Sequence, residues 1–245
     1  MALGSLRRNQ LLKTGNELSK NSYGQQLLSV VKRPILNCDG WCNCQSSGTK
    51  IWVSKVAYLT EVQLKNAGFK KIGREVKISD KASIYNADQI EIGDYSRIDD
   101  FCILSGKITL GKYNHITPMC LIAGGTPGIT FEDFCTLAYG VKVFSQSDDY
   151  SGETLTNSLL PKKFKNEKFA SVFFKRHVIV GAGSIVLPGV TIEEGCSIGA
   201  MTLLTKSTES WGVYTGVPAK RIKERKKDLL ELEAKFLEEQ NYDSI

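Results

Sequence analysis

Large apolar residues recur at every sixth position in the C-terminal half of the chain. Between positions 174 and 204 they are Phe174, Val180, Val186, Ile192, Ile198 and Leu204. A small or β-branched residue follows four places after each of the first five: Val178, Ser184, Val190, Cys196 and Thr202. A period of six is not the period of a helix, and it predicts one short strand with an inward-facing large residue per unit, followed by a turn with a small inner corner. Such units bury their apolar faces only by stacking, so the pattern predicts an all-β solenoid.

The same period is present in the preceding hundred residues, with two interruptions. It runs through Ile72, Ile78 and Ile84, and then through Ile92, Ile98, Leu104, Leu110, Ile116 and Ile122. Three extra residues within 123–130 delay the next large positions, Phe131, Leu137 and Val143. Four cysteines of this region fall on small inner positions, which predicts core fillers rather than nucleophiles or metal ligands: Cys102, Cys120, Cys135 and Cys196.

A long segment, residues 145–171, carries no repeat. Interruptions of this size within a compact domain are usually functional or disordered. The segment begins with the acidic stretch SDDYSG (147–152) and continues with a basic run over 162–168. We therefore expect an excursion loop here, inserted into a solenoid domain that spans residues 72–204.

Both ends of the solenoid are predicted to carry helices. Within residues 58–71, Thr60 is a typical N-cap and Gly68 a typical stop, so a short helix is expected to cover the first coil. Residues 205–245 leave the repeat, and a helix is predicted after Pro218. Its basic start, 220–227, suits a solvated helix face or a phosphorylated ligand better than nucleic acid or a membrane. Its apolar stripe consists of Leu229, Leu230, Leu232, Phe236 and Leu237.

The net charge of +6 does not indicate a nucleic-acid-binding domain. Residues 1–57 hold eight Lys or Arg and two acidic residues, so the rest of the chain is electrically balanced. No apolar run reaches the ~20 residues of a membrane span, and no secretory signal is recognisable. The odd number of cysteines, seven, predicts free thiols in the cytoplasm.

Residues 1–57 show no persistent period and are interpreted as an extension that is flexible or outside the working protein. Three cysteines in this segment, Cys38, Cys42 and Cys44, raise the question of a metal site. No histidine lies nearby, the spacing is not Cys-x-x-Cys, and a fourth ligand is missing, so no metal is expected.

The chain contains two histidines, and a base poised near neutral pH is most often a histidine. His115 precedes the inward-facing Ile116, so its side chain should point outward from the solenoid wall. If one coil is three units, Arg97 stacks directly below His115 and Thr136 above it, ~4.8 Å apart. An ordinary surface or interface role for His115 stays open, and His177, near a turn, is interpreted as structural.

Two stretches, GAGSIVLPGVTIEEGCSIGA (181–200) and TGVPAKRIKER (215–225), resemble the hexapeptide-repeat acyltransferases, which are left-handed parallel β-helices. The resemblance covers residues 58–245 and implies a homotrimer with active sites between solenoids. It implies acetyl-CoA or another acyl-CoA as co-substrate, with no permanently bound cofactor. The pantetheine arm is expected along Gly181, Ala182, Gly199 and Ala200, where small residues let a thin chain approach the backbone. The nucleotide end is expected near Lys206, Lys220 and Arg221.

Residues 97–116 and 147–153 are similar to a narrower group within this family. The group contains galactoside-acetyltransferase-like proteins of surface-polysaccharide clusters and N-acyltransferases of nucleotide-linked 4-amino-4,6-dideoxyhexoses. The resemblance implies acylation of a sugar hydroxyl or amino group in surface-polysaccharide or O-antigen biosynthesis, the N-acyltransferase with a longer acyl donor being the alternative. Galactoside and maltose acetyltransferases carry their catalytic histidine in the long loop, and this loop has none. The base is therefore His115, a loop carboxylate (Asp148 or Asp149), or absent.

Two mechanisms remain open at this point. For a hydroxyl acceptor, His115 would remove the proton, and a backbone N–H near Gly181 to Gly199 would bind the oxyanion. For an amine acceptor, Asp148, Asp149 or Asp100 could orient the nitrogen.

Arg97 and Tyr150 complete the candidate acceptor-binding residues. A non-catalytic trimeric scaffold and other small-molecule acetyltransferases are the competing classes. A zinc-dependent carbonic anhydrase of the same fold is not expected, because it needs three histidines and the chain has two, 62 positions apart.

Overall fold

The computed structural model of this chain describes residues 57–242. The N-terminal extension and its three cysteines lie outside the described residues, apart from Ala57. Residues 57–242 contain no helix that is long and apolar enough to cross a membrane.

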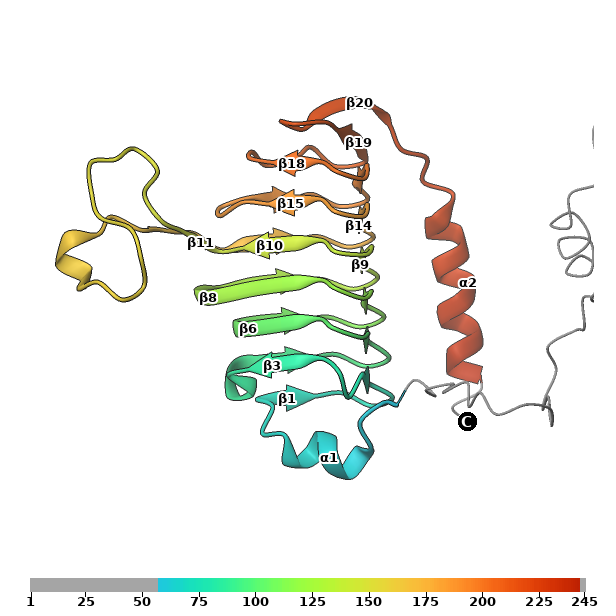
Figure 1. Cartoon of the computed structure of the whole chain (residues 1–245). Helices are drawn as coiled ribbons and strands as arrows, with labels where there is room; N and C mark the ends of the chain where they lie inside the picture. The colour runs from blue at the N-terminus through green and yellow to red at the C-terminus, as the bar shows by residue number, and fades with distance from the viewer. Residues whose placement is uncertain (1–56, 243–245) are drawn as a thin grey trace, which may run out of the picture. The chain divides into compact units, whose positions relative to one another are not determined.

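The protein is a solenoid of parallel coils, as the period of six predicts (Figure 1). Each full coil contributes a strand to each of three faces. The first face contains β3 (Ser83–Tyr85), the first part of β6 (Ile103–Leu110) and of β8 (Leu121–Phe131), β10 (Lys142–Phe144), β15 (Ile185–Val186) and β18 (Leu203–Leu204). The second face contains β1 (Lys71–Ile72), β4 (Ile90–Ile92), the last part of β6 and β8, β13 (Val172–Phe174) and β16 (Thr191–Ile192).

The third face carries the candidate site. It contains β2 (Lys77–Ile78), β5 (Arg97–Ile98), β7 (His115–Ile116), β9 (Thr136–Leu137), β14 (Ile179–Val180), β17 (Ser197–Ile198) and β19 (Gly212–Thr215). All of these strands pair in parallel. The last strand, β20 (Lys220–Glu224), pairs antiparallel with β19.

The large residues of the repeat form the core. Ile72 and Ile84 of the first coil are partly buried, and every other large residue of the repeat, from Ile78 to Leu204, is at most 2% exposed. Phe131 and Phe174 stack on the second face with ring centroids 4.1 Å apart. The four cysteines of this region are buried free thiols, and burial raises the pKa of the Cys135 thiol to about 12. The predicted register and the role of these cysteines are both confirmed.

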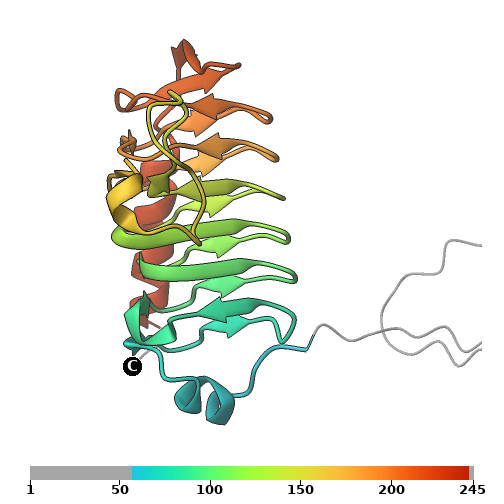
Figure 2. The same cartoon turned by 60° about the vertical axis from the view of Figure 1, so that its left-hand side comes forward.

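The excursion loop leaves the solenoid after β10 and returns at β13. A short antiparallel pair, β11 (Gln146–Ser147) with β12 (Lys168–Phe169), forms its base, and a 3₁₀ turn at Lys162–Phe164 lies further out. The loop projects from the corner between the first and second faces (Figures 1 and 2). The third face lies on the opposite side of the solenoid.

The N-terminal helix forms as predicted. In α1 (Glu61–Asn66), Thr60 makes a capping box with Gln63, and Gly68 follows the helix with a φ of +75°. Leu64 is the buried residue of this helix. A second 3₁₀ turn, Ala87–Gln89, interrupts the repeat between β3 and β4.

The prediction of a helix directly after Pro218 is wrong. Residues 220–224 form β20, which covers the exposed edge of the last coil, and the helix α2 (Leu229–Tyr242) begins later. An unpaired terminal strand carries a row of free N–H and C=O groups, and pairing satisfies them. The predicted stripe is also only partly packed, because Leu232 is 64% exposed.

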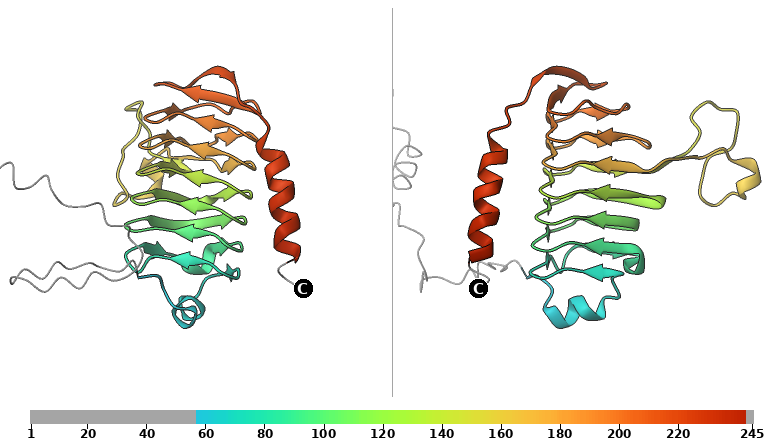
Figure 3. Two further views of the ribbon diagram at one scale, coloured as in Figure 1. Left: turned by 90° about the vertical axis from the view of Figure 1, so that its right-hand side faces the viewer. Right: turned by 180° about the vertical axis from the view of Figure 1, so that it is seen from behind.

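α2 runs beside the corner that joins the second face to the third (Figure 3). Aromatic rings of successive coils stack there, with centroids 4.9–5.2 Å apart: Tyr95, Tyr113, Phe134 and His177. Phe236 of α2 packs edge-on against Tyr113 and Phe134. His177 Nε2 lies 2.8 Å from Glu233 Oε2 of α2, and Arg176 also contacts this carboxylate. The structural interpretation of His177 is therefore confirmed.

Candidate functional site

His115 lies on the third face with its neighbours stacked as predicted. The register pairs Arg97 with His115 and His115 with Thr136. The imidazole side chain is 39% exposed, whereas Ile116 beside it is fully buried. His115 thus points outward from the wall, where an acceptor could reach it.

Asp99 is a functional candidate that the sequence reasoning missed. Its carboxylate accepts a hydrogen bond from Arg97 Nε at 2.5 Å and lies 2.9 Å from His115 Nε2. The Asp99 side chain is only 8% exposed. Hydrogen bonding to Asp99 raises the pKa of the Arg97 guanidinium, so the pair is held as an ion pair. The three side chains form one connected cluster on neighbouring coils.

Asp100 takes no part in this cluster. Its two oxygens contact Ser79 Oγ at 2.5 Å and Lys81 Nζ at 2.9 Å, both in the first coil. The hydrogen bond from Ser79, followed by that from Lys81, lowers the pKa of the Asp100 carboxyl. The structure therefore does not bring Asp100 to His115.

The small residues expected to line the pantetheine arm lie directly above one another. Val180 pairs with Ile198, so Gly181 lies in register with Gly199 at the corner between the third and first faces. A Cβ on Gly181 would lie 2.4 Å from Ala200 N, and one on Gly199 would lie 2.9 Å from Thr215 Oγ1. Only glycine fits at position 181, and the neighbouring Ala182 and Ala200 have side chains no larger than a methyl group.

A backbone N–H near Gly181 to Gly199 was expected to bind the oxyanion, and this expectation needs correction for the amides of these two glycines. Gly181 N–H donates to Ile198 O at 2.8 Å, and Gly199 N–H donates to Tyr214 O at the same distance. Both amides are committed to holding neighbouring coils together. An oxyanion must therefore be bound by other donors.

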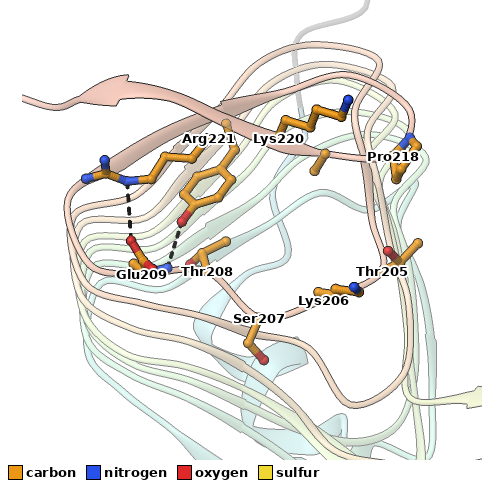
Figure 4. Close-up of a pocket in the computed structure, with 10 residues that line it drawn as sticks. Thr205, Lys206, Ser207, Thr208, Glu209, Pro218, Lys220 and Arg221 are labelled. Carbon is orange, nitrogen blue, oxygen red and sulfur yellow. Dashed lines mark hydrogen bonds and ion pairs between the residues drawn. The ribbon is translucent and has the colours of Figure 1, made fainter.

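The cationic residues expected at the nucleotide end meet at the C-terminal end of the solenoid. Lys206, Lys220 and Arg221 line one hollow of about 440 Å³ (Figure 4). Arg221 is ion-paired there with Glu209, at 3.7 Å, and with Glu224. Within residues 57–242, no carboxylate lies within ion-pair distance of Lys206 or Lys220. These two ammonium groups are available to a phosphate.

Asp148, Asp149 and Tyr150 belong to the excursion loop, which within one chain lies on the opposite side of the solenoid from the third face that carries His115 (Figure 1). Asp149 accepts hydrogen bonds from Ser151 N at 2.8 Å and from Thr154 Oγ1 at 2.7 Å. These bonds, the Ser151 amide foremost, lower the pKa of Asp149 to about 2. Asp148 is exposed, and no described donor contacts its carboxylate. Tyr150 is 91% exposed.

Comparison with known proteins shows similarity to curated acyltransferases. No family model matches the chain. The dTDP-4-amino-4,6-dideoxy-D-glucose acyltransferase of Escherichia coli is 45% identical over 184 residues, which covers 74% of this chain and 95% of the relative. A chloramphenicol acetyltransferase of Klebsiella aerogenes is 36% identical over 72 residues, 27% of this chain and 34% of that protein.

Solved structures of AntD, an N-acyltransferase from Bacillus cereus, are similar over most of their length. The complex with dTDP and 3-hydroxybutyryl-CoA is 44% identical with a TM-score of 0.74, covering 75% of this chain and 98% of AntD. A variant of AntD bound to dTDP-4-amino-4,6-dideoxyglucose and coenzyme A has a TM-score of 0.75, again with 44% identity, over 76% of this chain and 100% of that one.

Proposed function

Because the chain belongs to the hexapeptide-repeat acyltransferase family that includes the dTDP-4-amino-4,6-dideoxy-D-glucose acyltransferase of Escherichia coli, we propose that it N-acylates a nucleotide-linked 4-amino-4,6-dideoxyhexose. The protein is an acyl-CoA-dependent sugar acyltransferase with the left-handed β-helix fold of this family. A non-catalytic scaffold is thereby set aside. The amino group as the acceptor and the nucleotide on the sugar are our proposal. The observation that carries it is the 45% identity over an alignment that covers 95% of the relative.

The proposed reaction forms an amide and releases coenzyme A. The neutral sugar nitrogen attacks the thioester carbonyl carbon, and the nitrogen becomes positively charged. We assign His115 as the base that takes its proton before the carbon–sulfur bond breaks. The His115 imidazolium then gives this proton to the departing thiolate, which restores the neutral imidazole. Asp148 is assigned to orient the amine through its second N–H, because the oxygens of Asp149 are bound within the loop.

The donor is proposed to lie along the corner between the third and first faces. Lys206 and Lys220 bind the phosphates, and the pantetheine arm follows Gly199 and Gly181 toward His115. The coil of Gly199 is three coils above that of His115, a span of about 14 Å at the usual strand spacing. This direction carries the acyl group toward the His115 cluster.

A homotrimer is proposed because one chain does not contain the whole site. The excursion loop, whose residues include Asp148, and the third face, which carries His115 on β7, lie on opposite sides of the solenoid (Figures 1 and 2). A neighbouring copy can bring its loop to the third face. Such a neighbour would also cover large side chains that are exposed at or beside the corner between the third and first faces. These are Phe101, Met119, Tyr139 and Met201, which are 57–72% exposed.

We also propose a cytoplasmic location and a role in surface-polysaccharide biosynthesis. All four described cysteines are free thiols, which fits a reducing compartment. Acyl-CoA is the co-substrate of the reaction, and nucleotide-linked sugars are activated building blocks for glycan assembly.

Product analysis by mass spectrometry tests the proposed reaction. Purified protein is incubated with dTDP-4-amino-4,6-dideoxyglucose and with acetyl-, butyryl- or 3-hydroxybutyryl-CoA. We expect one acyl group per sugar, as an amide that survives hydroxylamine, together with one equivalent of free thiol. Thiol release with no acylated sugar, or a hydroxylamine-sensitive ester, contradicts N-acylation.

Lys206→Ala is expected to weaken donor binding without changing the chemical step. Loss of one charge-assisted hydrogen bond to a phosphate should raise the KM for acyl-CoA about tenfold and leave kcat unchanged. Acyl-pantetheine lacks the nucleotide, so its KM should be the same for the variant and the wild type. Lys235→Ala, an exposed lysine of α2, is the matched control. An equal effect on both donors would remove Lys206 from the nucleotide site.

A further inference from the structure

The contacts among Asp99, Arg97 and His115 support a second inference, beyond the assignment of His115 as the base. Asp99 and Arg97 share one coil, whereas His115 belongs to the next coil above. Asp99 N–H donates to Ile116 O at 3.0 Å, so the backbone of Asp99 is fixed to the coil that holds His115. The carboxylate is therefore presented to the imidazole by main-chain hydrogen bonding.

The charges in this cluster determine which imidazole nitrogen carries a proton. A buried carboxylate needs a cation or donors, and Arg97 supplies a full positive charge at Oδ1. The second oxygen, Oδ2, faces His115 Nε2 at 2.9 Å. A carboxylate only accepts hydrogen bonds, so Nε2 must be the N–H side of the neutral ring. Nδ1 then holds the free lone pair, and no described atom hydrogen-bonds to it.

We propose that Asp99 is a positioning residue that fixes the Nε2–H tautomer of His115 and so makes Nδ1 the nitrogen that accepts the proton of the attacking amine. During the reaction the proton moves from the sugar nitrogen to Nδ1, and the resulting imidazolium stays paired with Asp99. Arg97 balances the Asp99 charge before this step. The proposal rests on the proposed function through His115, but the tautomer itself does not depend on any substrate.

Asp99→Asn tests this arrangement with little change in shape. Its amide oxygen can accept from Arg97, and its NH2 group then faces His115, so Nε2 must become the acceptor and Nδ1 the N–H. We expect kcat to fall about 10²–10⁴-fold while the KM for acyl-CoA is unchanged. Asp94→Asn is the matched control, since Asp94 binds Arg74 N and Lys112 on a different corner. It should retain wild-type kcat.

Nitrogen-15 NMR of the imidazole rings separates a positioning role from a structural one. The chain has two histidines, and His115→Gln assigns the His115 signals. We expect the Nε2–H pattern for His115 in wild-type protein and in Asp94→Asn, and the Nδ1–H pattern in Asp99→Asn.

An unchanged tautomer with unchanged kcat in a folded Asp99→Asn protein overturns the proposal. Equal losses of kcat in the Asp99 and Asp94 variants overturn it too. If the wild type acylates no amine, the proposed function fails while the NMR result still decides the role of Asp99.

Discussion

His115→Gln is expected to lose about 10²–10⁴-fold in kcat on an amino-sugar acceptor, the usual range for removal of a general base. Glutamine keeps a polar side chain of similar reach and can still hydrogen-bond Asp99, but it cannot take up a proton. The KM values for acyl-CoA should stay close to wild type because the donor-binding corner is untouched. Steady-state thiol release at saturating donor measures both parameters.

The second histidine provides the control for this experiment. His177→Gln removes the contact with Glu233 and should loosen α2, which lowers the melting temperature and leaves kcat at the wild-type level. Asp148→Asn supplies the other comparison. Full kcat in His115→Gln, together with a large loss in Asp148→Asn, would transfer the role of base to the loop carboxylate.

Co-assembly of two impaired variants is expected to restore activity. His115→Gln removes the proposed base from the third face and leaves the loop intact. Asp148→Asn alters the loop and leaves the third face intact. Loss of a charge-assisted hydrogen bond should lower the activity of Asp148→Asn by about 10–100-fold. If each site joins the loop of one chain to the third face of the next, an equal random mixture has about one quarter of its sites intact.

The measurement uses the two variants unfolded together and refolded, with each variant refolded alone as control. Native mass spectrometry of differently sized tags confirms that mixed oligomers form. Recovery to about a quarter of the wild-type rate supports sites shared between neighbouring copies, and the masses of the mixed oligomers give the number of chains in the ring. A mixture no more active than the sum of the separate variants, despite proven mixing, shows that each site belongs to one chain.

The period of six predicted the solenoid because its physical cause is local. A large residue fills the interior, a small one fits the corner, and both requirements repeat with each coil. Arg97, His115 and Thr136 could be stacked correctly from spacing alone, since their strands pair in register. The inward positions of the cysteines followed from the same rule.

Asp99 was missed because its contact with His115 is diagonal. The two residues are sixteen positions apart, not a whole coil, and the carboxylate reaches up from the corner that follows β5. From the sequence alone, a residue directly after an inward-facing position is interpreted as an ordinary turn residue. Backbone attachment to the next coil determines where its side chain points, and no sequence spacing reveals that.

β20 was misread as the start of a helix for a related reason. A basic run with good helix formers favours a helix locally, but the open edge of the last coil supplies a strand partner. The tertiary environment outweighed the local preference over 220–224. The place of the Asp148 loop in the site is harder still to predict from the sequence, because its partner there is proposed to be another copy of the chain.

The ratio of kcat/KM for an amine to that for a hydroxyl acceptor is the measurement that tests the central claim most directly. dTDP-4-amino-4,6-dideoxyglucose is compared with dTDP-6-deoxyglucose, which differs only in carrying a hydroxyl group at the same carbon. With the same acyl-CoA, we predict a preference for the amine of at least about 10³-fold. The hydroxyl group carries one hydrogen where the amine carries two, so either His115 or Asp148 is left without its partner. Equal values, or a preference for the hydroxyl, would contradict the assignment of this protein as a nucleotide-sugar N-acyltransferase.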